Sequence, residues 1–436
     1  MKKKIIGLSI LLILVIVIIT IFSLNKNIGF EDFTEGKGTI DDPYLISSAE
    51  QLNNIRNHMD KHFKLISDID FSRYKNWEPI GTYPLRHGQK SGFYGTFDGN
   101  GYVIKNIRIS DTNKNHVGLF GFIERRNDYY GEINNLKLEN IKIRGNNFVG
   151  GIVGFNEGII LNSSVNGNIK GNDSVGGFVG VNSGIIKNSY FEGVVQGEKL
   201  IGGFVGDNLI LDKREIYIKN SHSNAKVKGN QVVGGFVGRN HSNIFNSYSL
   251  GNVEGNKIVG GFIGASSKYS ITSNSYSKSN VVGEEILGGF IAGNFGKIEN
   301  SYSIGNIEGK NFIGAFISAN SGKIENSYST GNVKGEVGIG GFIFINEEQG
   351  IIANSYSTGL IKGKENVSGF INENNGVILS SYYDHERIKI SDNISKEFKR
   401  TTNEMKTKST YISWDFENIW EIDEGISYPY FKWQVE

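Results

Sequence analysis

The chain lacks cysteine altogether and holds only four prolines, three methionines and four tryptophans among its 436 residues. Without cysteine there are no disulfide bonds, no thiolate metal sites and no lipid attachment at an N-terminal cysteine. The absence also suits a protein that works outside the cell, where free thiols are oxidised.

Net charge is equally scarce, since 46 basic residues stand against 45 acidic ones. A nucleic-acid groove needs basic charge of one sign along its length. One outward position that recurs along this chain mixes the signs instead, and we therefore expect no nucleic-acid partner. Its occupants are Lys170, Gln196, Lys228, Glu254, Glu308, Lys334 and Lys362.

Long hydrophobic runs are missing, except for the twenty apolar or small residues from Ile5 to Leu24, which follow Lys2, Lys3 and Lys4. Such a run is long enough to span a bilayer, and the lysines orient it with the chain outside. It is also longer than the apolar core of most signal peptides. We expect residues 1–24 to be an uncleaved N-terminal membrane anchor, with a cleaved signal peptide as the alternative, and residues 25–37 to be a linker.

Glycine, by contrast, is abundant, with 58 residues, and it marks an internal repeat. A second marker, Asn-Ser, keeps the same interval, which is most often 26 residues. Repeats of 20–50 residues are typical of solenoids, propellers and arrays. The Gly-Gly pairs begin at Gly150, Gly176, Gly202, Gly234, Gly260, Gly288, Gly314 and Gly340, with Ser368 starting a Ser-Gly version. The Asn-Ser pairs begin at Asn162, Asn188, Asn220, Asn246, Asn274, Asn300, Asn326 and Asn354.

One repeat, VGGFVGVNSGIIKNSYFEGVVQG from Val175, holds three short apolar runs rich in β-branched and aromatic residues. None is long enough for a helix, and three strands in about 26 residues make one coil of a parallel β-helix. We therefore predict an all-β parallel β-solenoid, with three strands per coil, over residues 118–382. Residues 38–117 would form an N-terminal helical cap and the first coils, and residues 383–436 a C-terminal aromatic cap.

Stacking of coils places equivalent residues in columns one strand spacing apart. Phe178 and its counterparts would form one column, and Tyr190 and its counterparts another, interrupted by Ser164 and His222. Alternation with Ile186 predicts that the tyrosines face the core; the alternative is an exposed column that stacks on sugar rings. The Asn of each Asn-Ser pair, such as Asn188, is expected to point inward and form an amide ladder.

The repeat changes length at one corner only. The interval that is six residues between Asn182 and Asn188 grows to twelve at Asn208–Asn220 and to eight at Ser266–Asn274 and Asn346–Asn354. Insertions confined to one edge of a solenoid often mark its binding face, although corners also tolerate insertion better than strands do. The candidate ligand-binding face is the longest insertion, with Leu209, Asp212, Lys213, Arg214, Glu215 and Tyr217.

Two caps are expected. Ser47 followed by Glu50 has the spacing of a capping box, which predicts a short helix over residues 48–57. At the other end, three tryptophans (Trp414, Trp420 and Trp433) fall within about twenty residues. They predict a packed cap on the last coil, with an aromatic ligand patch as the alternative.

The repeat pattern VGGFVGxNxGxIxNSYSxGxVxG, together with the lead-in GTFDGNGYVIKNI and the ending SYPYFKW, resembles the GLUG-motif repeats of bacterial surface and secreted proteins. These repeats also occur in the N-terminal region of IgA-specific metallopeptidases. The resemblance implies an adhesin-like β-solenoid on the extracellular side of the bacterial cell envelope, anchored by residues 5–24 or secreted if that segment is cleaved. It brings no established chemistry.

Catalytic patterns are weak. His58 and His62 are one helical turn apart, but Met59 stands where a zinc peptidase needs its Glu. Asp68, Asp70 and Asp98 fall in the cap region and do not form a repeated acidic column. We expect no catalytic residues, no metal and no cofactor. The expected function is a non-catalytic adhesin-like protein whose extracellular ligand is a glycan, host matrix or cell-envelope component; the alternative is a carbohydrate-active β-helix enzyme, a polysaccharide lyase or hydrolase.

Overall fold

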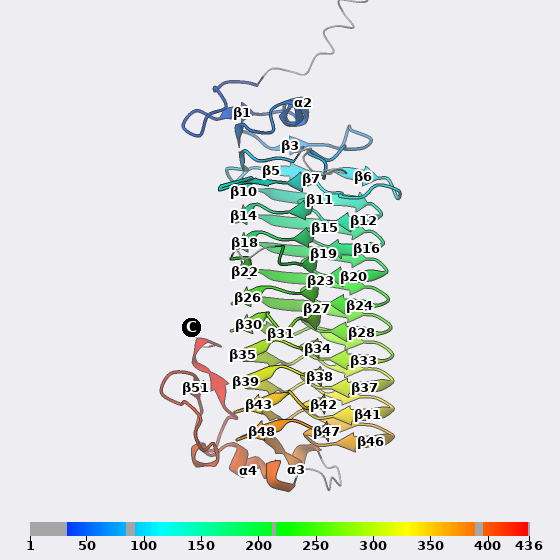
Figure 1. Cartoon of the computed structure of the whole chain (residues 1–436), viewed down its shortest axis with the longest axis vertical. Helices are drawn as coiled ribbons and strands as arrows, with labels where there is room; N and C mark the ends of the chain where they lie inside the picture. The colour runs from blue at the N-terminus through cyan, green and yellow to red at the C-terminus, as the bar shows by residue number, and fades with distance from the viewer. Residues whose placement is uncertain (1–32, 84–91, 212–214, 389–395, 435–436) are drawn as a thin grey trace, which may run out of the picture.

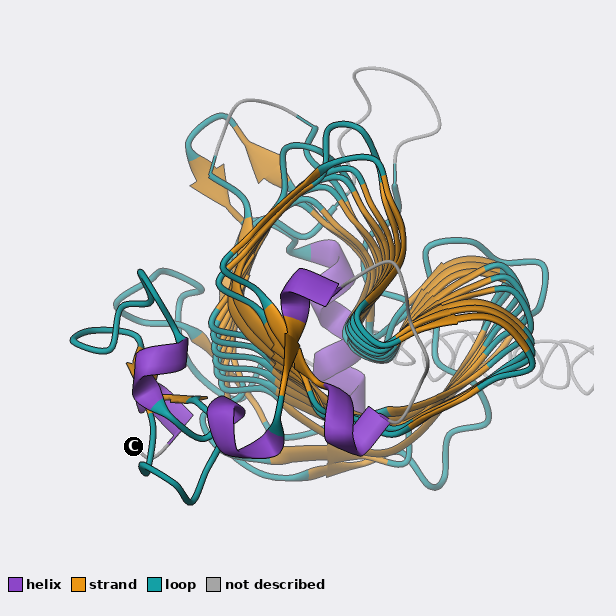
Figure 2. Ribbon diagram, turned by 90° about the horizontal axis from the view of Figure 1, so that it is seen from below, coloured by secondary structure: helices purple, strands orange, loops and turns teal. Residues whose placement is uncertain are grey.

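The structure is a computed structural model that describes residues 33–83, 92–211, 215–388 and 396–434. The chain winds into a rod of successive coils, and all strand pairs between described coils are parallel (Figure 1). Viewed along the rod axis, the strands of successive coils superimpose (Figure 2). The predicted parallel β-solenoid is therefore confirmed. The membrane-anchor prediction for residues 5–24 lies outside the described residues.

Each coil of the repeat region contributes to three sheets. The coil that begins at Asp173 runs through the nine-stranded sheet, turns at Gly177-Phe178 into the ten-stranded sheet, and then enters the 29-stranded sheet, called here the wide sheet. On the wide sheet the chain bends at Asn188, so that many coils show two strand segments on that side. The apolar run Val175–Val179, which the sequence suggested was one strand, thus spans a corner between two strands. The repeat period alone did not reveal this corner.

The strands of the two smaller sheets follow one another coil by coil. The ten-stranded sheet holds β7 Phe120–Ile123, β13 Val153–Asn156, β17 Val179–Asn182, β21 Val205–Asn208, β25 Val237–Asn240, β29 Ile263–Ser266, β34 Ile291–Asn294, β38 Ile317–Asn320, β42 Ile343–Asn346 and β47 Ile371–Asn374. The nine-stranded sheet holds β12 Asn147–Val149, β16 Asp173–Gly176, β20 Lys199–Gly202, β24 Val232–Gly234, β28 Ile258–Gly260, β33 Ile286–Gly288, β37 Asn311–Gly314, β41 Val337–Gly340 and β46 Glu365–Ser368.

The wide sheet begins in the N-terminal cap and runs the length of the rod. Its first strands are β1 Tyr44–Ile46, β2 His62–Leu65, β3 Ile69–Asp70, β4 Thr96–Asp98, β5 Val103–Lys105 and β6 Arg108–Ser110. The strands of the repeats are β10 Glu132–Asn134, β11 Lys137–Arg144, β14 Ile159–Leu161, β15 Ser164–Lys170, β18 Ile185–Lys187, β19 Tyr190–Gln196, β22 Tyr217–Lys219, β23 His222–Lys228, β26 Asn243–Phe245, β27 Tyr248–Glu254, β30 Ile271–Ser273, β31 Tyr276–Ser277, β32 Asn280–Val282, β35 Lys297–Ser303, β36 Ile307–Glu308, β39 Lys323–Ser329, β40 Val333–Lys334, β43 Ile351–Ala353, β44 Tyr356–Ser357, β45 Ile361–Lys362, β48 Val377–Leu379, β49 Tyr382–Asp384 and β50 Lys399–Arg400.

The predicted phenylalanine column is the centre of the core. Phe178 and Phe204 stack with ring centroids 4.5 Å apart, and both are fully buried. The stack continues through every following coil at similar spacing. Its members are Phe178, Phe204, Phe236, Phe262, Phe290, Phe316, Phe342 and Phe370.

The Gly-Gly pair makes the corner beside this column. A Cβ on Gly176 would lie 2.0 Å from the carbonyl oxygen of Val179, and one on Gly177 would lie 2.4 Å from the ring of Phe191. Phe191 belongs to the wide sheet on the opposite side of the coil. In this coil the corner therefore turns inward until it touches the wide sheet, and a side chain at Gly176 or Gly177 would clash with its neighbours. Later coils hold small side chains, Ala315 and Ser368, at the equivalent positions.

The tyrosine column does not face the core, so the inward prediction is wrong. Asn188 has a positive φ of 51°, which breaks the alternation of side chains along the strand. Ser189 is buried as a result, while Tyr190 points outward and is 39% exposed. His222 does not interrupt the column either, since its ring stacks 4.9 Å from Tyr190 and 4.6 Å from Tyr248.

The last four tyrosines of the column also point outward, but they are buried by the C-terminal segment. Tyr302, Tyr328, Tyr356 and Tyr382 pack under the C-terminal segment, which folds back along the outer face of the wide sheet (Figure 1). Trp414, Trp420 and Phe431 form the inside of this cover. The predicted aromatic cap is thus present, but it covers the side of several coils. Its elements are α3 His385–Ile388, η2 Lys396–Phe398, α4 Thr402–Met405, η3 Lys408–Thr410, η4 Lys432–Gln434 and the antiparallel pair β51 Trp420–Glu421 and β52 Tyr430–Phe431.

Two asparagine ladders run along the rod. The predicted one is present, with Asn188 donating to Asn162 over 3.0 Å, but Asn188 is exposed instead of buried. The second ladder was not predicted as such. In it Asn182 donates to Asn208 over 2.8 Å, and both side chains are fully buried.

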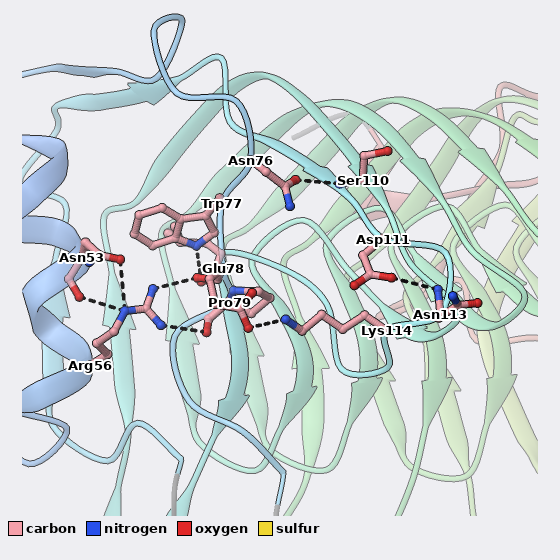
Figure 3. Close-up of polar contacts among 11 residues, drawn as sticks. Asn53, Arg56, Asn76, Trp77, Glu78, Pro79, Ser110, Asp111, Asn113 and Lys114 are labelled. Atoms are coloured by element: carbon pink, nitrogen blue, oxygen red, sulfur yellow. Dashed lines mark hydrogen bonds and ion pairs between the residues drawn. The ribbon is translucent and has the colours of Figure 1, made fainter.

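The N-terminal cap holds α2 Ala49–Asn54 and the 3-10 turn η1 Ile55–Asn57, where the sequence predicted a helix. The capping residue is Ser48, one position later than expected, and its hydroxyl accepts from the Gln51 amide. Figure 3 shows how Arg56 ties the helix to the first coils, donating to the carbonyl oxygen of Glu78 over 2.8 Å. Trp77 donates to the carbonyl oxygen of Leu119 over 3.0 Å.

Candidate binding corner

The turn between each strand of the ten-stranded sheet and the next strand of the wide sheet is called here the insertion corner. The three long intervals predicted from the sequence all fall on it, between β21 and β22, β29 and β30, and β42 and β43. A further insertion follows β7, where β8 Arg125–Arg126 and β9 Tyr129–Tyr130 form a hairpin. One edge of the rod therefore carries the irregular loops.

Large apolar side chains are exposed along this edge. Tyr129 in the hairpin is 77% exposed, Leu211 in the longest insertion 53%, Tyr269 72% and Phe295 55%. These residues come from different coils, and each lies at the insertion corner. Exposed apolar side chains gathered on one edge are typical of a surface that meets a partner.

A hollow of about 260 Å³ lies on the outer face of the wide sheet beside the end of the longest insertion. Glu215 and Tyr217 enter it from the insertion. The Lys187 ammonium lies 5.1 Å from the centre of the Tyr217 ring, a cation–π contact. The hollow thus combines an aromatic ring with charges of both signs. Its lining is Lys187, Asn188, Glu215, Tyr217, Lys219, Asn220 and Phe245.

The candidate face is brought together only in part. Glu215 and Tyr217 line the hollow, whereas Leu209 is half-buried and packs against the apolar cluster on the ten-stranded sheet that Val181 shares with Phe122 and Phe155. Asp212, Lys213 and Arg214 lie outside the described residues.

Sequence reasoning missed the residues that neighbouring coils add to the hollow. Lys187 and Phe245 flank Lys219 in register on the adjacent strands. The register of the Asn-Ser repeats carries this signal, because each of the three stands directly before an Asn-Ser pair.

At the start of the insertion, the buried carboxylate of Asp207 forms an ion pair with the half-buried Arg239. Arg239 donates to Asp207 through Nε at 3.0 Å and through Nη2 at 2.5 Å, and Asp207 is only 3% exposed. The hydrogen bond to Asp207 raises the pKa of Arg239. Because a two-pronged contact fixes direction as well as distance, the pair sets how the chain leaves β21 for the insertion.

The carboxylates singled out in the sequence serve the fold. Asp68 accepts from the Val103 amide over 2.9 Å, and Asp98 accepts from the Asn100 amide over 2.8 Å. Asp70 accepts from the Asn106 side chain over 2.7 Å. His62 hydrogen-bonds to Thr96. In the part of the chain that the structure describes, no group of three His, Cys, Asp or Glu residues is arranged to hold a metal ion.

Glu157, in the first coils, has a raised carboxyl pKa. Burial, followed by the neighbouring charge of Glu124, raises the pKa of Glu157. Glu124 is itself buried and held by Arg126 over 3.1 Å and by the Gly92 amide over 3.1 Å. A general acid and base pair needs two carboxyl groups that both reach substrate, and Glu124 is fully engaged within the fold.

Comparison with known proteins agrees with the repeat pattern. The family model described as the GLUG motif matches residues 229–254, one coil of the solenoid. The chain therefore carries the GLUG motif, as its resemblance to GLUG-repeat proteins indicated.

Two relatives match about a third of the chain but little of their own length. A protein of Evansella cellulosilytica, provisionally named a Gly-rich membrane protein, is 36% identical over 176 residues, which are 37% of this chain and 19% of that protein. Halomucin of Haloquadratum walsbyi is 35% identical over 154 residues, 32% of this chain and 2% of that protein.

A crystal structure from Bacteroides ovatus, provisionally described as an immunoglobulin A1 protease, aligns over 92% of this chain and 95% of its own, with a TM-score of 0.33 and 19% identity.

Among the helices of the described ranges, none has the length and apolar character needed to cross a membrane.

Proposed function

We propose that this chain is a non-catalytic, adhesin-like binding protein of the cell surface, and that the insertion corner is its contact edge. The observation that carries the proposal is the gathering of exposed apolar side chains, Tyr129, Leu211, Tyr269 and Phe295, on the one edge where the repeat varies in length. The names of the two relatives, a membrane protein and a halomucin, support a place in the cell envelope. The ligand class is a glycan, host matrix or another envelope component.

A stiff rod suits this role. Contacts repeated along one rigid scaffold gain from effective concentration even when each is weak. The loops at the corner recur on separate coils, so a long ligand meets several of them at once. The lysines and apolar run of residues 2–24 would hold the rod at the membrane.

The enzyme alternative has little support from the described side chains. The one carboxyl group among them with a raised pKa, Glu157, has Glu124 as its acidic neighbour, and that group is tied to Arg126. A polysaccharide lyase or hydrolase needs free acidic or basic groups in a groove.

The experiment exchanges the longest insertion for an ordinary corner. Residues 209–217 of the full chain are replaced by Ser-Gly-Ile, which stand at the same place after Asn182 and keep the buried Ile218. Binding is measured on a glycan and matrix array and by attachment of cells that display the protein. We expect the variant to fold and to lose most of its binding.

A matched control shortens a different corner. Residues 347–350 are replaced by Ser-Gly, which removes an insertion that exposes no large apolar side chain among its described residues. This variant should bind as the native chain does. Equal binding by all three chains would overturn the contact edge, and release of oligosaccharides from an array polymer by the native chain would favour the enzyme.

A further inference from the structure

The outer face of the wide sheet carries a concentration of positive charge near the N-terminal end of the rod. Arg108, Lys142, Arg144 and Lys170 line a hollow of about 500 Å³ and are all exposed. They come from β6, β11 and β15, which are successive coils in Figure 1. These four residues are called here the basic patch.

The strand register places these cations close together. Lys142 is the partner of Arg108, and Lys170 is the partner of Arg144, each one strand spacing of about 4.8 Å apart. Lys142 and Arg144 lie two residues apart on one strand and so share a face. Among the described residues, none of the four makes an ion pair.

Several cations further along the rod are paired with acids on the next coil. Further along the same column, Lys228 pairs with Glu254 over 2.5 Å and Lys334 pairs with Glu308. Beside that column, Lys310 pairs with Glu284 over 2.6 Å and Lys364 with Glu336 over 2.7 Å. In these four places a cation is neutralised by an acid on the next coil, whereas the four neighbouring cations of the basic patch have no such acid and repel one another.

A second hollow on the same face provides the comparison. It has a volume of about 440 Å³ and is lined by Asn280, Asn306 and Asn332 together with the paired Glu308 and Lys334. The shape of the sheet therefore creates a hollow towards both ends. The N-terminal one is lined by four cations without an ion pair among the described residues and by no acid, whereas the other holds the pair Glu308–Lys334 and one further cation, Lys362. Shape alone does not explain the charge.

We propose that the basic patch is a binding site for an acidic polysaccharide. Carboxylate or sulfate groups along one polymer chain would meet the cations of successive coils, and Arg108 and Arg144 offer the fork that binds a carboxylate through two hydrogen bonds. Ser110, Asn168 and Gln196 also line the hollow and suit sugar hydroxyls. The inference names a site that is separate from the insertion corner and does not depend on it.

A nucleic acid fits the patch less well. Single-stranded nucleic acids are held by bases that stack on aromatic side chains, and no aromatic residue lines this hollow. The patch also ends after about three coils, where Val194 and Gln196 take the equivalent positions. The acidic residues of the strands involved, Glu139 and Glu192, do not line the hollow.

The test measures binding of the full chain, extracted in a mild detergent, to polygalacturonate in 50 mM and 200 mM salt. We expect tight binding that weakens steeply with salt, as for any polyanion that releases counterions. The variant with Arg108, Lys142, Arg144 and Lys170 all changed to Gln should bind about tenfold more weakly or worse, with a shallower dependence on salt. Neutral dextran should not bind to either chain.

The control variant changes Lys310, Lys334, Lys362 and Lys364 to Gln, which removes the same charge from the other end of the rod. It should keep native affinity, and so should the Ser-Gly-Ile variant of the insertion corner. Equal losses in both four-residue variants would show an effect of net charge and overturn the site. Absence of polygalacturonate binding by the native chain, or tighter binding of an oligothymidylate, would overturn the acidic-polysaccharide assignment.

Discussion

Asn208 donates from its side-chain amide to Asn240 over 2.7 Å and accepts from Asn182 over 2.8 Å, inside a corner where all three side chains are fully buried. The amide ladder therefore runs through the interior of the rod, directly beneath the longest insertion. It fixes the corner from which the insertion departs.

The Asn208→Ala variant should be markedly less stable, because it leaves a buried donor of Asn182 and a buried acceptor of Asn240 without these partners. Asn182 still donates to the Gly184 carbonyl and Asn240 still accepts from the Ser242 amide, so we expect the loss of the two buried hydrogen bonds to cost on the order of 1–3 kcal/mol in total. Urea unfolding followed by circular dichroism measures the loss.

The matched control is Asn188→Gly in the exposed ladder. Glycine adopts the positive φ of Asn188 without strain. The two hydrogen bonds that are lost, with Asn162 and Asn220, are exposed, so we expect a change below about 1 kcal/mol. Equal losses in the two variants would mean that burial does not decide the strength of the ladders.

The repeat period was enough to predict the solenoid, its phenylalanine column and the corner that carries insertions. The direction of the tyrosines was not accessible by the same reasoning. Alternation from Ile186 to Tyr190 assumes an unbroken strand, and the positive φ of Asn188 breaks it. Asn is one of the few residues that adopt this conformation routinely, so the recurring Asn was the available signal.

The candidate site was predictable only in its location. Contacts between coils, such as Lys187 above Tyr217, depend on the register of neighbouring repeats. The return of the C-terminal segment along the rod is a long-range contact with no local pattern, as when Gln434 donates to the Tyr328 hydroxyl over 2.7 Å. The basic patch was hidden because Arg108, Lys142 and Arg144 come from the irregular first coils and only Lys170 belongs to a regular repeat.

The Trp420→Ala variant should release the C-terminal segment from the side of the rod. Trp420 is fully buried, with ring centroids 4.6 Å from Trp414 and 4.3 Å from Phe431, and removal of a buried Trp costs about 3–5 kcal/mol. Limited proteolysis should cut this segment while the solenoid resists.

The milder Trp420→Phe variant is the control, because Nε1 of Trp420 has no hydrogen-bond partner among the described residues. Its segment should stay largely protected. If Trp420→Ala is as resistant to protease as the native chain, the segment is held by other contacts.

The Gly176→Ala variant should destabilise the coil, since the new methyl group would lie 2.0 Å from the carbonyl oxygen of Val179. Backbone at that distance must shift, and we expect a fall in melting temperature of several degrees. Gly293→Ala is the control: its methyl group meets nothing within 4 Å, and Ala265 and Ala319 already stand at the same register. Comparable melting temperatures for the two variants would contradict the conclusion that the corner at Gly176 is too tightly packed for a side chain.

Acid should weaken the first coils through His116. Its ring lies between those of Tyr83 and Phe148, at 4.9 Å and 4.8 Å, and burial lowers the pKa of His116 to about 4. In the unfolded chain the pKa of His116 is about 6.5. Between pH 6.5 and pH 4, His116 is therefore protonated in the unfolded state and neutral in the folded state. The free energy of unfolding therefore falls as the pH drops from about 6.5 toward 4.

The His116→Phe variant keeps a flat ring in the stack and removes this dependence. Unfolding measured at pH 7 and pH 4.5 should show a smaller loss on acidification in the variant than in the native chain. The Glu157→Gln variant should change the acid response in the opposite direction. The raised pKa of Glu157 stabilises the folded state at low pH, and this contribution disappears as the pH rises. Without it, the variant should lose more stability on acidification than the native chain. An identical acid response of His116→Phe and the native chain would show that His116 is charged within the stack.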